Sequence, residues 1–465
     1  MFSQKTYTDR RTVLKSSVGK GVILLTGNEE SCINFSDNWY PFRQDSTFLY
    51  YFGLPQPGLA AILDCESGEE ILFGDDLSID EIVWTGDQPT ILELAKSVGV
   101  AESRPMSALE KLIGSTMDAG RKLHMLPPYR SAQKILLAEL TGWPANTLTD
   151  QASLPLINAI ARQRNIKTTE EIDEIERAVA ITTKMHLEAM KFVKAGMKEH
   201  EVAGKVYETA IGMGGQLAFP LILTRDGQTL HNHSHHNVLK EGDMVLCDTG
   251  AETSKGYCGD MTRTFPVSDR FTSQQAAIYE IVLQAHTRAV DALKPGMAFR
   301  EIHLLACAEL FEGLKSLGLT KGDTHEAVAA GAHAMFFQCG LGHLMGLDVH
   351  DMENLGEENV GYTKQITKSQ QFGLKSLRLG RELEEGFILT VEPGIYIIPQ
   401  LIDLWQSEKR HEDFINYREL EKFRGFGGIR IEEDFLITSS GSRLLGPPVP
   451  KSVDEIETIR ANVTG

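Results

Sequence analysis

The chain has 465 residues, too many for one ordinary hydrophobic core, so its length predicts two or three domains. A hydrophobic fraction of 42% is typical of a globular protein, and a formal net charge of −18 argues against nonspecific binding to nucleic acid, which needs a basic surface. The N-terminus lacks an apolar core of signal-peptide length, and no stretch approaches about 18 uninterrupted apolar residues. We therefore expect a cytoplasmic protein with no nucleic-acid partner and no membrane partner.

The cysteines indicate reduced thiols rather than a disulfide framework. They lie far apart and include no C-x-x-C pair, which also argues against a zinc knuckle. The set consists of Cys32, Cys65, Cys247, Cys258, Cys307 and Cys339.

The first third of the chain alternates strand-like and helix-like segments, which predicts an α/β domain. Apolar runs typical of strands cover Val22–Leu25, Ala60–Leu63 and Glu70–Phe73. The helix-like segments lie around Ile91–Val98 and around Ser131–Leu140.

Aromatic residues are concentrated in Thr47–Gly53, shortly after Tyr40–Gln44. We expect this segment to form a core strand beside a turn.

The chain becomes irregular around Gly142–Pro144 and then runs through a short helix to Asn165–Glu171. We place the domain boundary there, which gives an N-terminal domain at 1–166 and a second domain at 167–465. Thr168 and Glu171 form a possible capping box at the start of a long helix.

The second domain contains two faint internal repeats. Lys194–Met197 recurs one hundred residues later as Lys294–Met297, in each case between helix-like segments. Glu241–Gly250 aligns with Glu385–Gly394, and both segments read as a strand that ends in an acid and a glycine. The common order predicts a duplicated α/β half with pseudo-two-fold symmetry, and with acids from the two halves facing one another.

The first half carries Asp248 and Asp260 on a predicted β-hairpin. Two aspartates on opposite arms can face one point, where they would repel each other unless cations held them together. The alternative is that one aspartate is a turn residue and the other pairs with Arg263.

The second half supplies matching acids. The repeat places Glu392 opposite Asp248, and Glu432 lies on a strand-like segment where it mirrors Asp260. Between these acids, a glycine-rich segment carries His343 and His350. Four acids and a histidine on a symmetric frame favour a metal centre over scattered structural roles.

At these residues the chain resembles metal-dependent aminopeptidase P, of the pita-bread peptidase family that also includes prolidase, creatinase and methionine aminopeptidase. The resemblance covers nearly the whole length, and Tyr40–Gln44 resembles the N-terminal domain that aminopeptidase P shares with prolidase and creatinase. It implies an α/β N-terminal domain followed by an α+β pita-bread catalytic domain with a pseudo-two-fold repeat.

The resemblance also assigns residue roles. His231 and His350 match histidines that contact substrate and stabilise the oxyanion, and Arg430 matches an arginine beside the last ligand. Cys339 stands where close relatives often carry a histidine. The family's metal ligands fall on Asp248, Asp260, His343, Glu392 and Glu432.

Of the cluster His231, His233, His235 and His236, the first has a family counterpart. For the other three we expect a solvated loop rather than a second metal site.

Charge counting extends this interpretation. Four carboxylates and a neutral imidazole carry about −4, which two divalent cations neutralise, and oxygen-rich ligation favours Mn²⁺ over zinc. A metal-bridged hydroxide would attack the first carbonyl of a peptide with proline in the second position. Glu392 would pass the proton to the leaving proline nitrogen.

Two other functions stay open. The first is prolidase, an Xaa-Pro dipeptidase that shares every ligand. The second is a metal-free, non-catalytic pita-bread module that binds partners. The family usually forms dimers or tetramers, so we expect a homo-oligomer, and Asp37 and Trp84 are candidates to rim a neighbour's active site.

Overall fold

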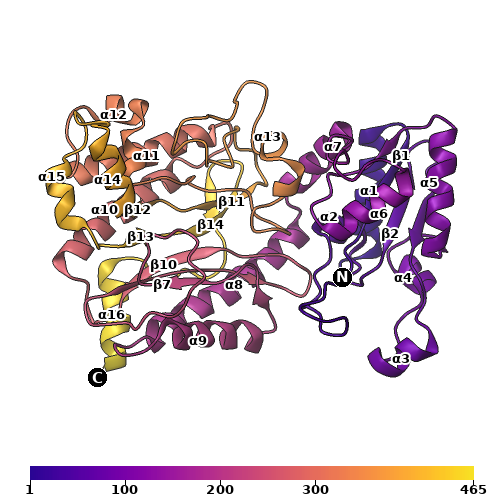
Figure 1. Cartoon of the computed structure of the whole chain (residues 1–465), viewed down its shortest axis with the longest axis horizontal. Coiled ribbons are helices and arrows are strands. Elements are labelled where there is room, and N and C mark those ends of the chain that lie inside the picture. The colour runs from indigo at the N-terminus through magenta and orange to yellow at the C-terminus, as the bar shows by residue number, and fades with distance from the viewer. Residues whose placement is uncertain (465) are drawn as a thin grey trace. The chain divides into compact units, whose positions relative to one another are not determined.

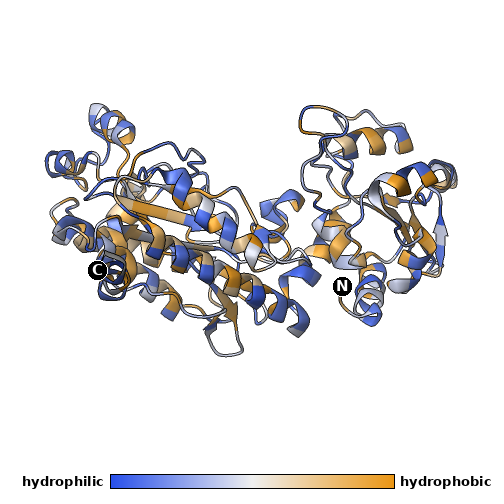
Figure 2. Ribbon diagram, turned by 90° about the horizontal axis from the view of Figure 1, so that it is seen from below, coloured by the Kyte–Doolittle hydropathy of each residue, from blue (hydrophilic) through white to orange (hydrophobic). Residues whose placement is uncertain are grey.

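The computed structural model describes residues 1–464, which form two compact units (Figure 1). Unit 1 contains Met1–Arg164 together with a short later segment, Met352–Val360, and unit 2 contains Asn165–Asp351 and the chain from Gly361 onward. Figure 2 shows predominantly hydrophobic strands and helices that alternate between hydrophobic and hydrophilic residues. No helix within residues 1–464 is long and apolar enough to cross a membrane.

Unit 1 is built on a mixed sheet with the strand order β4-β3-β2-β1-β5. The central strands pair antiparallel, and the outer strands β4 and β5 pair parallel with their neighbours. The strands are β1 (Val22–Thr26), β2 (Ala60–Asp64), β3 (Glu70–Phe73), β4 (Glu102–Arg104) and β5 (Leu123–His124). The predicted α/β class and the expected strand runs are confirmed.

Helices surround this sheet, and part of its apolar surface packs against α5 and α6 through Leu109, Ile113 and Leu137. The helices are α1 (Gln4–Val18), α2 (Ser46–Phe52), α3 (Ile79–Thr85), α4 (Ile91–Ser97), α5 (Leu109–Asp118), α6 (Ser131–Thr141) and α7 (Leu154–Asn165).

The aromatic segment Thr47–Gly53 forms helix α2, so the expectation of a core strand is wrong. The Asp45 carboxylate accepts the Phe48 amide at 2.9 Å, which caps the start of the helix. Gly53, at φ 66°, ends it in the left-handed conformation that glycine adopts readily. All seven residues of α2 are buried, so no alternation of polar and apolar residues marked it as a helix.

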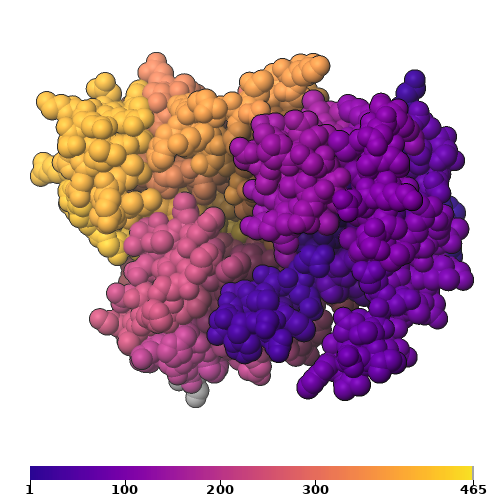
Figure 3. Space-filling model, turned by 45° about the vertical axis from the view of Figure 1, so that its right-hand side comes forward, coloured from indigo at the N-terminus to yellow at the C-terminus, as the bar shows by residue number. Residues whose placement is uncertain are grey.

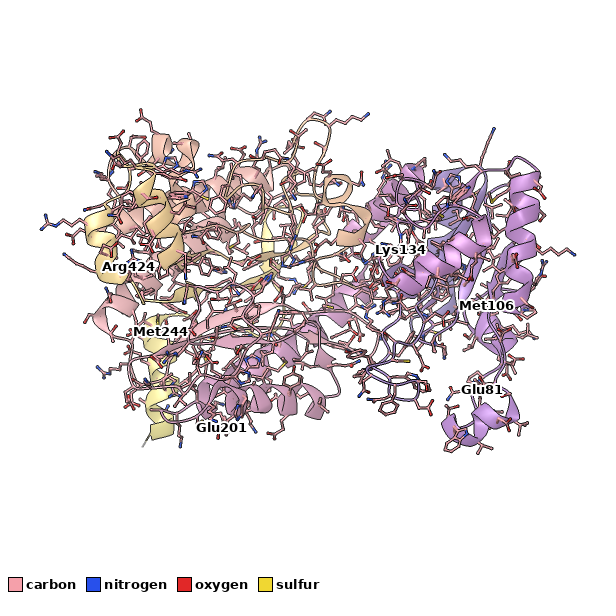
Figure 4. All side chains as sticks on the ribbon, viewed as in Figure 1. Glu81, Met106, Lys134, Glu201, Met244 and Arg424 are labelled. Carbon is pink, nitrogen blue, oxygen red and sulfur yellow. The ribbon has the colours of Figure 1, made fainter. Side chains whose placement is uncertain are left out.

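Unit 2 is built from two halves, each a helix pair followed by a small sheet. In the first half, α8 (Thr169–Phe192) and α9 (Glu199–Gly212) precede the sheet β10-β8-β7. In Figure 1, α9 lies below these strands, and α10 (Ser273–Asp291) and α11 (Phe299–Ser316) of the second half lie above them. Figure 4 labels Glu201 on α9 and Met244 at the first position of β8. The first-half strands are β7 (Ile222–Thr224), β8 (Met244–Thr249) and β10 (Met261–Pro266), and a short pair is formed by β6 (Gln216–Leu217) and β9 (Ala251–Glu252).

The second half repeats this plan with α10 (Ser273–Asp291), α11 (Phe299–Ser316) and the sheet β11-β14-β15. Its strands are β11 (Ile388–Val391), β12 (Gly394–Tyr396), β13 (Gly428–Arg430), β14 (Glu433–Ile437) and β15 (Ser442–Leu444). Shorter helices are α12 (Thr324–Ala330), α14 (Pro399–Ser407), α15 (Tyr417–Leu420) and α16 (Val453–Thr464), with α13 (Glu357–Val360) in unit 1.

Backbone hydrogen bonds confirm the predicted repeat. In the first half, the Gly196 amide donates to Leu239 O at 2.8 Å, and the Leu239 amide donates to Met197 O at 2.8 Å. In the second half, Gly296 donates to Leu383 O at 2.8 Å, and Leu383 donates to Met297 O at 2.9 Å. The same reciprocal pairing ties each helix-pair loop to the segment that leads into β8 or β11. The two halves therefore aim these strands in equivalent ways.

The long helix expected after the boundary is α8, and its start has the predicted interaction. The Thr168 amide and hydroxyl both donate to the Glu171 carboxylate at 3.0 Å.

Candidate metal centre

The first-half hairpin brings Asp248 and Asp260 to one end of β8 and β10. The two strands pair antiparallel, with Asp248 opposite Thr262, and Asp260 directly precedes β10. The Asp260 amide donates to the Asp434 carboxylate at 3.0 Å, which fixes the backbone at this point. Among the described residues, Asp260 Oδ1 is buried and has no hydrogen-bond partner.

The alternative role for this hairpin fails because Arg263 has other partners. Its guanidinium forms a buried ion pair with Glu433 and donates to the backbone carbonyls of Thr262 and Glu432 at 3.0 and 2.9 Å. Asp260 is therefore not neutralised by Arg263, and its carboxylate points into a site that needs a cation from elsewhere.

The second half contributes Glu392 directly after β11 and Glu432 directly before β14. The Glu392 amide donates to Leu341 O at 2.7 Å. The Glu432 amide donates to Thr262 O at 3.1 Å, and Thr262 Oγ1 donates to the Glu432 carboxylate at 2.7 Å. These bonds join the two half-sheets at the acids themselves, so the acids of both halves converge.

His343 is oriented by its own backbone. Its amide donates to Thr390 Oγ1 at 3.2 Å, and its Nδ1 lies 3.2 Å from Leu344 O. A carbonyl accepts, so Nδ1 carries the proton and Nε2 presents a lone pair. Nε2 lies 3.5 Å from Asp260 Oδ2 and 3.8 Å from Glu392 Oε1. A Cβ at Gly342 would come within 2.0 Å of Thr390 O, so this close approach requires glycine.

The donor set suits a hard divalent cation. Asp260, His343 and Glu432 each offer a ligand atom within 4.8 Å of the other two, and all three side chains are buried. Glu392 adjoins this group through His343, and Asp248 acts electrostatically on Asp260, Glu392 and Glu432. The structure thus brings the predicted ligands together, with oxygen as the predominant donor, the kind of site that Mg²⁺ and Mn²⁺ prefer.

Burial and mutual repulsion shape the electrostatics. Burial raises the pKa of Asp260 well above its ordinary value, and the neighbouring Asp248, Asp434 and Glu392 add to the effect. Burial likewise raises the pKa of Glu392 and of Glu432. Burial lowers the pKa of His343, so the imidazole is neutral and able to act as a ligand. The carboxylates are therefore poised to exchange protons for metal.

Arg430 is a protein cation buried at the centre, and it pairs with Asp248. Its guanidinium forms a buried ion pair with Asp248, donates to Tyr396 OH at 2.8 Å and donates to Thr262 Oγ1 at 3.0 Å. All three guanidinium nitrogens therefore donate to protein oxygens, which holds Arg430 in place beside the acids.

The predicted substrate histidines lie beside the acids. The His350 ring meets the His343 ring edge-on, with centroids 4.4 Å apart. His231 is close enough to interact electrostatically with Asp248, Arg430 and His350. Of the other loop histidines, His233 stacks on His231 at 6.4 Å, and His235 Nδ1 lies 3.1 Å from Leu223 O.

Cys339 lies next to the same centre. Its Sγ is 3.9 Å from Tyr396 OH, and burial raises its pKa to about 12, with the Glu392 charge adding to the shift. At neutral pH it is a thiol, which is a poor nucleophile.

Sequence reasoning did not identify Tyr396, which holds Arg430, or Arg378. The positive charge of Arg378 acts on both Glu392 and His343. Neither residue stands in a motif, because their roles depend on long-range packing. Asp434 could have been found from the sequence, because the two-residue period of a strand places it on the same face as Glu432.

Comparisons with known proteins agree with this geometry. The family model described as metallopeptidase family M24 matches residues 173–439, and the model described as aminopeptidase P, N-terminal domain, matches residues 7–125. The chain is 33% identical to Xaa-Pro dipeptidase of Homo sapiens, covering 95% of this chain and 88% of that protein. It is 29% identical to Xaa-Pro aminopeptidase of Escherichia coli, covering 98% of each.

Solved structures match over the whole chain. Aminopeptidase P from E. coli with the inhibitor Pro-Leu has a TM-score of 0.82 at 28% identity, covering 100% of this chain and 99% of that one. The Pseudomonas aeruginosa aminopeptidase PepP has a TM-score of 0.81 at 27% identity, with the same coverage. Both predicted domain types and the pita-bread fold are confirmed.

The raised carboxyl pKa values predict opposite pH responses for the metal-free and metal-loaded protein. Folded metal-free protein holds protons on these acids that the unfolded chain releases near pH 4, the ordinary carboxyl value. The contribution of these acids to its stability should therefore be fully present below that value and should be lost as pH rises through the raised values. In the metal-loaded protein the metal takes the place of these protons, so its stability should fall less as pH rises. The difference in thermal midpoint between the metal-loaded and the metal-free protein should therefore widen from about pH 5 to pH 8.

Thermal unfolding of chelated and Mn²⁺-loaded protein across this range measures the gap. Glu432→Gln should flatten the pH response, whereas Glu384→Gln, an exposed partner of Arg381, serves as the control and should not. A gap that narrows as pH rises would contradict the assignment of these acids to a metal centre.

Proposed function

The chain belongs to metallopeptidase family M24, and from this premise we propose that it is an Xaa-Pro aminopeptidase with two divalent metal ions, preferentially Mn²⁺. The reaction would release the N-terminal residue from peptides whose second residue is proline. The observation that carries the proposal is the convergence of Asp260, His343, Glu392 and Glu432, with Asp248 beside them, at the junction of the two half-sheets.

Charge supports two metal ions rather than one. The four carboxylates have one protein cation in their midst, Arg430, whose guanidinium is committed to Asp248, while half-buried Arg378 acts electrostatically on Glu392 from a position that solvent partly screens. One divalent ion would leave a buried, net negative cluster, which is costly in a low-dielectric interior. A preference for Mn²⁺ follows from oxygen donors, because zinc favours nitrogen and sulfur.

The bound metals would supply an activated water and a Lewis acid for the scissile carbonyl. The chain's own residues would do the rest. Burial raises the pKa of Glu392, the direction that lets a carboxyl group hold and deliver a proton near neutral pH. His350 and His231 would donate hydrogen bonds to the developing oxyanion from the side of the centre that they line.

The proline preference rests on the chemistry of the bond. An Xaa-Pro bond has no N–H, so a site that clamps a peptide N–H cannot hold it. The leaving nitrogen must be protonated directly, and Glu392 would perform that step.

A second candidate is an Xaa-Pro dipeptidase. Sequence identity favours it, because the human dipeptidase is 33% identical and the E. coli aminopeptidase 29%. Arg430 adds less support, since three of its five N–H groups and its charge are already engaged with the protein. Half-buried Arg378 supports the dipeptidase candidate, because its charge acts on Glu392, and the free carboxylate of a dipeptide bound there would need a cation. The whole-chain match to aminopeptidase P structures favours the first candidate.

We also propose that the protein is a homo-oligomer, a dimer or tetramer. Helix α3 has no buried residue, and Ile79, Val83 and Trp84 are 76%, 75% and 87% exposed. Figure 3 shows a knob with the colour of these residues, and Figure 4 labels Glu81 on the same helix. Apolar side chains this exposed are typical of a contact surface. Sedimentation velocity should give a mass above 51.5 kDa, lowered by Trp84→Ala, whereas a monomeric wild type would refute the proposal.

Two substitutions separate proton transfer from oxyanion stabilisation. Glu392→Gln should keep the fold and reduce kcat by about 10²–10⁴, because it removes both a ligand charge and the proton carrier. His350→Ala should reduce kcat by about 10²–10³ and leave metal content unchanged, because His350 is proposed to contact substrate.

His236→Ala, at an exposed position in the same histidine-rich loop, is the matched control and should match wild type in both readouts. Metal analysis accompanies the kinetics. If His350→Ala loses metal, or changes kcat less than about tenfold, the role given to His350 is wrong.

The substrate class is tested with Ala-Pro, Ala-Pro-Ala and Ala-Ala-Ala at equal concentration in the presence of Mn²⁺. An aminopeptidase should cleave the proline tripeptide and should spare the alanine control. Cleavage of the dipeptide alone would identify a dipeptidase, and Arg378→Ala should then raise KM for Ala-Pro while the control Arg381→Ala should not. Comparable cleavage of Ala-Ala-Ala would remove the proline preference.

A further inference from the structure

A second cluster of metal-binding side chains lies on the buried face of α11. His303 and Cys307 are one helical turn apart on this helix, and His333 reaches them from the short 3₁₀ helix Ala332–Met335. Each of the three offers a ligand atom within 4.8 Å of the other two, and none is more than 2% exposed. None of them belongs to the ligand set of the carboxylate-rich centre.

The polar atoms of this cluster are poorly satisfied by the protein. His303 Nε2 lies 3.4 Å from Cys307 Sγ. Among the described residues, His303 Nδ1 and both ring nitrogens of His333 have no well-formed hydrogen bond, although the backbone of Val328 lies close enough to His333 to interact with it. Buried polar atoms are nearly always hydrogen-bonded in folded proteins, so a group of poorly paired ring nitrogens in one place calls for an occupant.

The surroundings favour a cation bound by neutral ligands. Burial lowers the pKa of His303 to about 3 and that of His333 to about 4, so both imidazoles keep their lone pairs at neutral pH. The Phe337 ring packs 5.5 Å from His303, and the ionisable neighbours that act on the cluster are Cys339 and His411, with no carboxylate among them. A hard ion, which prefers carboxylate ligands, therefore finds none among the described groups that act on this cluster.

We propose that His303, Cys307 and His333 bind one zinc ion, at a site separate from the proposed Mn²⁺ centre. Nitrogen and sulfur donors are those that zinc prefers. Tetrahedral zinc holds a nitrogen and a sulfur ligand about 3.5 Å apart, given bond lengths of about 2.0 and 2.3 Å, and the His303–Cys307 distance is 3.4 Å. The Cys307 thiol loses its proton on binding, as thiol ligands of zinc do.

Such an ion would act as a structural tie. It would join α11 to the segment that runs from His333 towards His343. This segment is also held by β12, because the Tyr396 amide donates a hydrogen bond to Phe336 O at 2.8 Å. The ion would thereby stiffen the support of His343, a proposed ligand of the carboxylate-rich centre, without taking part in hydrolysis.

Cobalt distinguishes the two kinds of site in the full-length protein. Co²⁺ bound to a thiolate shows a sulfur-to-cobalt charge-transfer band in the near ultraviolet, whereas Co²⁺ among carboxylates and imidazole does not. Wild-type protein saturated with Mn²⁺ is titrated with Co²⁺, and we expect the band to saturate at one equivalent per chain. One equivalent of Zn²⁺ should then abolish it. A folded wild type that never shows the band overturns the proposal.

Variants locate the sulfur. Cys307→Ser should lose the band, His333→Ala should weaken Co²⁺ binding more than about tenfold, and Cys65→Ser, a partly buried thiol in unit 1, should behave as wild type. A band that survives Cys307→Ser and disappears in Cys339→Ser assigns the sulfur to the carboxylate-rich centre and overturns the proposal. Circular dichroism verifies folding, and if Cys307→Ser fails to fold, His333→Ala and the wild-type zinc competition decide.

Discussion

The second unit depends on how four buried carboxylates of like charge can share one space. Asp248, Asp260, Glu392 and Glu432 raise one another's energy by repulsion, and burial strengthens that repulsion because no water screens it. The protein neutralises one of them with Arg430 and fixes the rest through backbone contacts, notably between Glu432 and Thr262. The remaining negative charge has to be neutralised by protons or by cations. Metal occupancy of the centre and the free energy of unfolding of the unit are therefore thermodynamically linked.

The duplication explains how such a costly arrangement can be built. Each half needs to place one acid at the end of a strand and another directly before the antiparallel neighbour of that strand, which is β10 for β8 in the first half and β14 for β11 in the second. Neither half buries a large excess of negative charge by itself. The high density of negative charge arises where the two half-sheets meet, at Thr262 and Glu432. The site is therefore a property of the interface between the two halves rather than of either half.

Much of this could be predicted from the sequence, because the informative signals were local or repeated. The strands of unit 1 have short apolar runs, the repeat carries the same acid and glycine twice, and the helix start at Thr168 has its own capping residues. Helix α2 was predicted wrongly because burial on every side removes the periodicity that distinguishes a helix from a strand. Tyr396, Arg378 and the His303–Cys307–His333 cluster were missed for a different reason: tertiary packing, not spacing in the chain, brings these side chains to their partners.

The local hydrogen bond of His343 has a consequence for how the protein gains and loses metal. The ring is oriented by the carbonyl of the very next residue, Leu344, and by a backbone contact to Thr390, so its tautomer is set without help from any ion. Stripping the centre should leave this ligand aimed as before. We therefore expect metal uptake to begin at a preformed nitrogen ligand, and we expect its rate to depend on proton release from the carboxylates more than on rearrangement of the chain.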